Sequence, residues 1–92
     1  MSKVLETHWY LQERAQKLVE RLAPDFPIRV AIIYENDKIE WDKECSFGRV
    51  SWNCNFIIPL GHPARAVLPK LNRAITRLRE RYDLGVVRSP PG

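Results

Sequence analysis

Apolar side chains and one histidine recur at spacings of three and four residues in the first part of the chain. The row consists of Val4, His8, Leu11, Ala15, Leu18 and Leu22. Because this spacing matches the helical period, these side chains share one face of a helix. Ser2 is a suitable cap for the first turn, and Pro24 and Pro27 prevent the helix from continuing. The pattern therefore predicts an amphipathic helix over about Lys3–Leu22.

A period of two residues replaces the helical period after this segment, and such alternation is typical of half-buried strands. Three strands are predicted, at Ile28–Glu35, Lys38–Cys45 and Val50–Ile58. Asn36 and Asp37 tolerate the positive φ of a two-residue hairpin turn, and they separate the first two strands. In the resulting register Trp41, Trp52 and Phe56 face inward and are expected to be buried. These segments predict a three-stranded antiparallel meander with one buried face.

A second helix is predicted after Pro59 interrupts the last strand. Its apolar stripe consists of Leu68, Leu71, Ile75, Leu78 and Tyr82. The helix ends near Tyr82, and Gly85 occupies the position favoured for a C-terminal cap. Two starts are compatible with the sequence: the helix begins near Pro63 and kinks at Pro69, or Pro69 opens it as a first-turn residue. The order α-β-β-β-α predicts an α+β fold, a two-layer sandwich with both helices on one face of the sheet.

The length and composition of the chain favour one domain. Ninety-two residues suit a single core, and a hydrophobic share of 45% argues against intrinsic disorder. We expect this domain to span residues 1–85 and to be followed by a flexible tail over residues 86–92, where little apolar material is available for packing. The first residues do not form an apolar signal segment, no run reaches the roughly 18 apolar residues that span a bilayer, and two cysteines are too few for a disulfide scaffold. The expected location is cytoplasmic, without membrane contact.

Positive charge is concentrated in the last third of the chain. The whole sequence has a formal charge of +4, and residues 62–92 carry seven basic residues against Glu80 and Asp83, which is +5 for this part alone. Residues 35–44 carry five acidic residues against two lysines, which is −3. An uneven distribution of this kind indicates an anionic partner for the basic part.

The strongest candidate binding surface is a basic row on the second helix. Lys70, Arg73, Arg77 and Arg81 follow one another at spacings of three, four and four, with Arg65 and Arg79 beside them. Such spacing offers phosphates a ladder of cations about 5–6 Å apart, and arginine favours bidentate contacts with phosphate or carboxylate groups. The same row is also compatible with a plain solvated helix face.

Charges elsewhere do not form a comparable row. On the first helix a basic row beside an acidic row predicts mutual neutralisation: Lys3, Arg14, Lys17 and Arg21 against Glu6, Glu13 and Glu20. Glu40, Asp42 and Glu44 alternate outward on the predicted middle strand, where they would repel phosphate. Trp9 lies opposite the apolar stripe of the first helix, next to Tyr10, and is a candidate anchor for a protein contact.

The sequence offers little support for catalysis, metal binding or a cofactor. Its cysteines and histidines, Cys45, Cys54, His8 and His62, lack the C-x-x-C or H-x₃-H spacing of metal ligands. No nucleophile lies near a recognisable base, and the sequence contains no glycine-rich phosphate loop. We therefore expect neither an enzyme nor a metal or cofactor protein.

Two functions remain. In the first, a small non-enzymatic binding protein docks through its basic C-terminal helix onto nucleic acid or an RNA-containing protein complex. In the alternative, it is a protein inhibitor or adaptor that contacts an acidic protein surface through charge-complementary faces. Small phage inhibitors of CRISPR effector complexes are one example of this second class.

Overall fold

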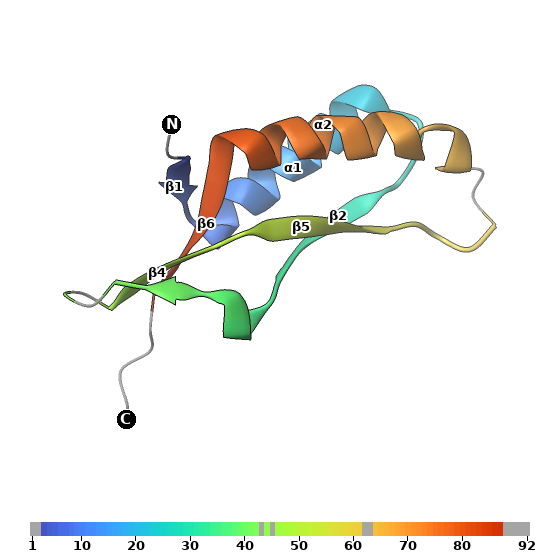
Figure 1. The fold of residues 1–92 in the computed structure, drawn as a ribbon. Coiled ribbons are helices and arrows are strands. Elements are labelled where there is room, and N and C mark those ends of the chain that lie inside the picture. Colours follow the sequence, from blue (N-terminus) through green and yellow to red (C-terminus); the bar gives the residue numbers. More distant parts are fainter. Residues whose placement is uncertain (1–2, 43, 45, 62–63, 88–92) are drawn as a thin grey trace.

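The computed structural model describes residues 3–42, 44, 46–61 and 64–87 (Figure 1). Its elements are β1 (Val4–Glu6), α1 (His8–Leu22), β2 (Arg29–Tyr34), the 3₁₀ helix η1 (Asn36–Lys38), β3 (Glu40–Trp41), β4 (Phe47–Val50), β5 (Trp52–Ile57), the 3₁₀ helix η2 (Ala64–Ala66), α2 (Leu68–Arg81) and β6 (Tyr82–Val87). The α+β fold is confirmed, but the predicted order lacks β1 and β6. The strands form mixed sheets in place of a simple meander, in the orders β1-β6-β4-β3 and β2-β5.

The predicted meander is wrong because the chain does not reverse at Asn36 and Asp37. These residues belong to η1, and β2 pairs directly and antiparallel with β5, with Tyr34 opposite Trp52. The predicted middle strand is reduced to β3, whose Trp41 lies opposite Gly48 of β4. The pairing register differs by three residues between β2-β5 and β3-β4. The three residues of η1 account for this difference. We call β2-β5 together with β3-β4 the antiparallel ribbon.

The first helix starts later than predicted. Residues Val4–Glu6 form β1, which pairs parallel with β6, and α1 begins at His8. Thr7 caps the helix, because its hydroxyl accepts a hydrogen bond from the backbone N–H of Tyr10 at 3.1 Å. Ser2, the predicted cap, lies outside the described residues. His8 is exposed and is not part of the core face.

The second helix begins at Leu68 with Pro69 in its first turn, so of the two compatible starts proline opens the helix. The predicted C-terminal cap at Gly85 is wrong, because the chain already turns to extended backbone at Tyr82 and continues directly as β6. Val86 and Val87, assigned to the tail, are the last residues of β6, where they pair with β4. The remaining residues of the predicted tail lie outside the described part of the chain.

Both helices lie side by side on the same side of β2 and β5 and run in opposite directions (Figure 1). The core between these elements consists of Leu11, Ala15, Val19, Ala23, Ile28, Val30, Ile32, Val50, Trp52, Leu71, Ile75, Leu78 and Leu84. Of the three residues predicted as buried, Trp52 is only 2% exposed, whereas Trp41 and Phe56 are half-buried. The Trp52 indole Nε1–H donates to the carbonyl of Tyr82 at 3.0 Å, which joins the ribbon to β6.

Two glutamines of α1 cover the edge of β2 that faces away from β5. The Gln16 amide donates to the carbonyl of Ile28 at 3.0 Å and accepts from the N–H of Val30 at 3.1 Å. The Gln12 amide repeats this pattern with the Val30 carbonyl and with the N–H of Ile32, the latter at 3.2 Å. The two glutamines are four residues apart on the helix, which is a rise of about 6.0 Å, and their backbone partners are shifted by two residues along the strand, which is about 6.6 Å. Because these two distances are nearly equal, both amides make the same contacts. The side chains thus mask the backbone groups of an edge strand.

Gly48 is required by close packing. A Cβ atom at this position would lie 2.6 Å from Ile39 Cγ2 and 2.8 Å from Trp41 Cε3. We expect Gly48→Ala to lower the free energy of unfolding by about 1–3 kcal/mol, because the ribbon must open to admit the methyl group. Gly85→Ala is the matched control: its Cβ would meet the Phe47 ring at 3.1 Å, and that ring is exposed enough to turn away. Equal melting temperatures of the two variants would contradict this prediction.

Candidate functional site

The structure separates the predicted basic residues into two groups. Lys70, Arg73, Arg77 and Arg81 are exposed on α2, as a solvent-facing row would be. Arg79 is half-buried on a different face, where it lines a hollow with Ser51 and Trp52 of the ribbon. Arg65 is exposed in η2, outside α2.

A groove of about 830 Å³ between the two helices collects arginines from both. We call it the arginine groove, defined by Arg14 and Arg21 of α1 and Arg77 and Arg81 of α2. Its apolar lining residues are Leu18, Leu22, Ala74 and Leu78. Glu80 also contributes to the lining. The groove therefore combines four cations with an apolar floor, and Leu22 keeps 40% of its surface exposed there.

The four arginines of the groove form no ion pair within the described residues, so Glu80 offsets only part of their charge. The ion pairs among all described residues are Lys3–Asp83, Lys17–Glu13, Lys38–Glu35 and Arg49–Asp83. None of them involves the four groove arginines, Lys70 or Arg73. Glu13, expected to neutralise the first helix, is held by Lys17 at 3.3 Å on another side of α1.

The contribution of α1 to this groove was missed by sequence reasoning, which treated the charges of the first helix as balanced. A usable signal was present. Arg14 and Arg21 lie seven residues apart, two helical turns, and therefore on one side of α1, next to Leu18. Glu13 and Glu20 follow the same period but are rotated away by one position. Which of these two sides of α1 faces α2 depends on where α2 packs, and the sequence of α1 does not contain that information.

Two tyrosines join the start of α1 to the end of α2 beside this groove. The rings of Tyr10 and Tyr82 meet edge to face with centroids 5.9 Å apart. A hydrogen bond with Tyr82 raises the pKa of Tyr10, and partial burial adds to the increase, while the positive charge of Arg14 opposes it. Tyr10 is therefore neutral at physiological pH and leaves the positive potential of the arginines undiminished.

The predicted row of outward acidic residues on the middle strand is wrong, because β3 contains only Glu40 and Trp41. Glu40 belongs to β3, whereas Asp42 and Glu44 follow the strand, and the Glu44 backbone N–H donates to Asp42 Oδ1 at 2.9 Å. Because the middle strand is so short, these carboxylates lie near the chain reversal between β3 and β4. The exposed outer side of β2 and β5 carries mostly uncharged residues instead, including Ile33, Asn55 and Ile57.

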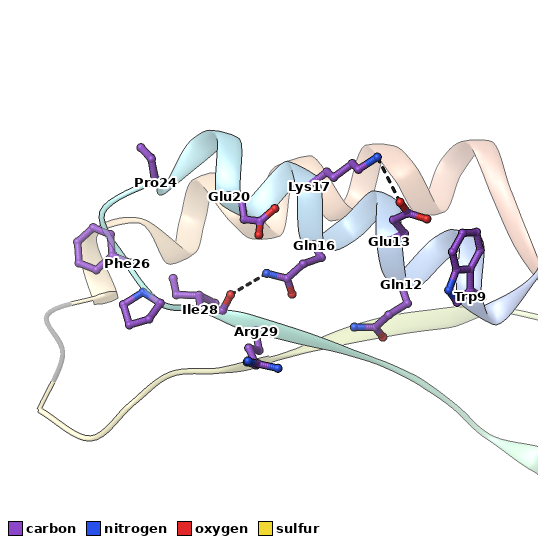
Figure 2. Close-up of a pocket in the computed structure, with 11 residues that line it drawn as sticks. Trp9, Gln12, Glu13, Gln16, Lys17, Glu20, Pro24, Phe26, Ile28 and Arg29 are labelled. Carbon is purple, nitrogen blue, oxygen red and sulfur yellow. Dashed lines mark hydrogen bonds and ion pairs between the residues drawn. The ribbon is translucent and has the colours of Figure 1, made fainter.

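A second groove, of about 720 Å³, lies on the opposite side of α1, along the covered edge of β2 (Figure 2). We call it the tryptophan groove. Trp9 lies at one end and Phe26 at the other, and Pro27 also lines the groove. Gln12 and Gln16 lie between them. Trp9, a predicted contact anchor, is 72% exposed.

Of the cysteines and histidines, the structure describes His8 and Cys54. Burial raises the pKa of the Cys54 thiol to about 11, although the positive charge of Arg79 opposes this increase. Cys54 is therefore a neutral thiol at physiological pH, a poor nucleophile and a poor metal ligand. Cys45 and His62 lie outside the described residues. Among the residues that are described, no three His, Cys, Asp or Glu side chains come together as metal ligands would.

In the part of the chain that the structure covers, neither helix has the length and apolar character needed to cross a membrane. No protein-family model, curated protein or solved structure was found to match this chain.

Proposed function

We propose that the protein is a non-catalytic binding protein that docks onto the phosphate backbone of nucleic acid, alone or within a nucleoprotein complex. The arginine groove is its contact surface, extended along α2 by Lys70 and Arg73. One observation carries this proposal: two helices contribute four arginines to a single groove, and within the described residues none of them forms an ion pair. Like charges held together in this way repel one another, and an anion relieves that repulsion.

The dimensions of the surface suit a phosphate backbone. Residues 70–81 of α2 extend over about 16 Å, which corresponds to about five base pairs of duplex at 3.4 Å each. Guanidinium groups donate two parallel hydrogen bonds to one phosphate, so each arginine both attracts and orients the backbone. Contacts of this kind position a protein on nucleic acid without reading its sequence. The expected activity is therefore sequence-independent and sensitive to salt.

The apolar floor supports a second candidate function. Leu18 and the partly exposed Leu22 offer nothing to a phosphate, but they suit the apolar side of an acidic amphipathic helix. In that case the protein is an inhibitor or adaptor that contacts an acidic protein surface, as the small phage inhibitors of CRISPR effector complexes exemplify.

Charge reversal within α1 tests the proposed function. We expect Arg14→Glu to weaken binding to a fluorescent 20-nucleotide RNA or DNA about tenfold or more, because it replaces an attraction with a repulsion in the groove. Fluorescence anisotropy at several salt concentrations measures the affinity, and neutralising a phosphate-contacting arginine lowers the salt dependence by about one unit. Lys17→Glu is the matched control, since it makes the same charge change on the same helix outside the groove. We expect it to have little effect.

The outcome separates the two candidates. If wild-type protein binds no single- or double-stranded nucleic acid at low salt, direct nucleic-acid binding is wrong. Saturable binding of a helical peptide that contains glutamate and leucine, with loss of binding in Arg14→Glu, then favours the inhibitor or adaptor function. If Arg14→Glu and Lys17→Glu weaken nucleic-acid binding equally, the arginine groove is not the contact surface.

A further inference from the structure

We propose that the tryptophan groove, on the other side of α1, binds an extended proline-rich segment of a partner protein. This site does not depend on the proposed function of the arginine groove. Figure 2 shows its components: Trp9 at one end, the amides of Gln12 and Gln16 between α1 and β2, and Phe26 at the far end. The side chain of Trp9 is 72% exposed. Tryptophan is among the residue types that most often dominate the binding energy of protein interfaces.

The polar groups of the floor suit a ligand that is rich in acceptors. Each glutamine amide uses one N–H and one oxygen lone pair to hold the edge of β2. The second N–H of each amide has no partner among the described residues. The indole N–H of Trp9 adds a third such donor. A proline-rich segment matches this set, because its carbonyls accept hydrogen bonds while its proline nitrogens have no hydrogen to donate.

The state of the β2 edge argues against an added strand as the occupant. A peptide that extends a sheet needs free backbone N–H and C=O groups along the edge. Here Gln12 and Gln16 already occupy those of Ile28, Val30 and Ile32. A polyproline II segment needs no such ladder, since it forms no backbone hydrogen bonds of its own and recognises aromatic-lined grooves.

The formal charges of the groove sum to zero, so it does not attract an anionic polymer as the arginine groove does. Glu13 and Lys17 neutralise each other at 3.3 Å, and the two other charged residues that line the groove, Glu20 and Arg29, have opposite formal charges. This neutral groove differs from the arginine groove and favours an uncharged ligand. Its length is consistent with the same ligand: the part of α1 that lines the groove, from Trp9 to Glu20, extends over about 16 Å, which about five residues of polyproline II cover at 3.1 Å each.

A pair of blocked peptides tests this inference on the whole protein. One is a ten-residue polyproline peptide, and the other is a ten-residue glycine-serine peptide of the same length and charge. Isothermal titration calorimetry should detect saturable binding of the first peptide and none of the second. Trp9→Ala should weaken the affinity about tenfold or more, which is the usual loss for an interface tryptophan. Trp9→Phe should retain part of the affinity, because an aromatic face remains. Arg14→Glu, in the other groove, should bind the peptide as the wild type does.

Several results would overturn the proposal. These are absence of saturable binding to polyproline, equal binding of the glycine-serine peptide, and an unchanged affinity in Trp9→Ala. Loss of nucleic-acid binding in Trp9→Ala with no peptide binding would assign the groove to the nucleic-acid surface. A dimer of the wild type that Trp9→Ala dissociates would assign it to a second copy of the chain.

Discussion

Replacing Trp52 with alanine should lower the free energy of unfolding by about 3–5 kcal/mol. The side chain is 2% exposed in the centre of the core, so its removal leaves a large cavity. It also removes the hydrogen bond from the indole to the Tyr82 carbonyl at 3.0 Å and leaves that acceptor without its partner. Since small domains are stable by only about 5–15 kcal/mol, this variant should be close to unfolded at 37 °C.

Guanidinium unfolding followed by far-ultraviolet circular dichroism measures this effect. Trp9→Ala is the matched control, because the same substitution at a 72% exposed side chain should change stability by less than about 0.5 kcal/mol. Phe56→Ala should fall between the two, since Phe56 is half-buried. A Trp52→Ala variant as stable as Trp9→Ala would show that the core is not built around Trp52.

The double variant Gln12→Ala/Gln16→Ala should lose about 2–4 kcal/mol of stability and should also self-associate. The two amides satisfy backbone groups of β2 at Ile28, Val30 and Ile32, and each group left without a partner in a partly buried position is costly. Their removal also uncovers the edge of a strand, which is a template for pairing with another chain.

Chemical unfolding and light scattering after size-exclusion chromatography measure the two consequences separately. The double variant Gln12→Glu/Gln16→Glu is an informative companion, because carboxylates still accept from the N–H groups but no longer donate to the carbonyls. It should therefore have intermediate stability. Glu20→Ala, on the exposed surface of the same helix, should leave stability and the monomer unchanged. A Gln12→Ala/Gln16→Ala variant that remains monomeric and stable would show that water replaces the amides without cost.

Different sides of helix α1 contact the core, the arginine groove and the tryptophan groove, so the two binding proposals can be tested independently. Leu11 faces the core, Arg14 faces the arginine groove, and Trp9 faces the tryptophan groove. Because Arg14 and Trp9 are both exposed, substitutions at either should leave the fold intact. A variant at one groove can therefore serve as the folded control for the other.

The sequence by itself determined the approximate position and the buried face of those elements in which apolar residues recur with a regular period. The spacing of Leu71, Ile75 and Leu78 predicted the buried face of α2, and all three belong to the core. The alternation over Val30 and Ile32 predicted a strand where β2 lies. Such local patterns are informative because a side chain repeats on the buried face with the period of its own backbone. The basic row of α2 is visible in the sequence for the same reason.

Tertiary structure alone decided which elements pair and which charges meet. The alternation of residues does not specify a strand's partner, so it predicts the wrong partner for β2, which pairs with β5 because the chain forms η1 in place of a hairpin turn. Three residues form β1 only because β6 offers them an edge. Likewise, Arg14 and Arg21 join Arg77 and Arg81 because α2 packs antiparallel beside α1. Long-range packing brings these residues together across more than fifty positions of sequence, and no local period encodes that distance.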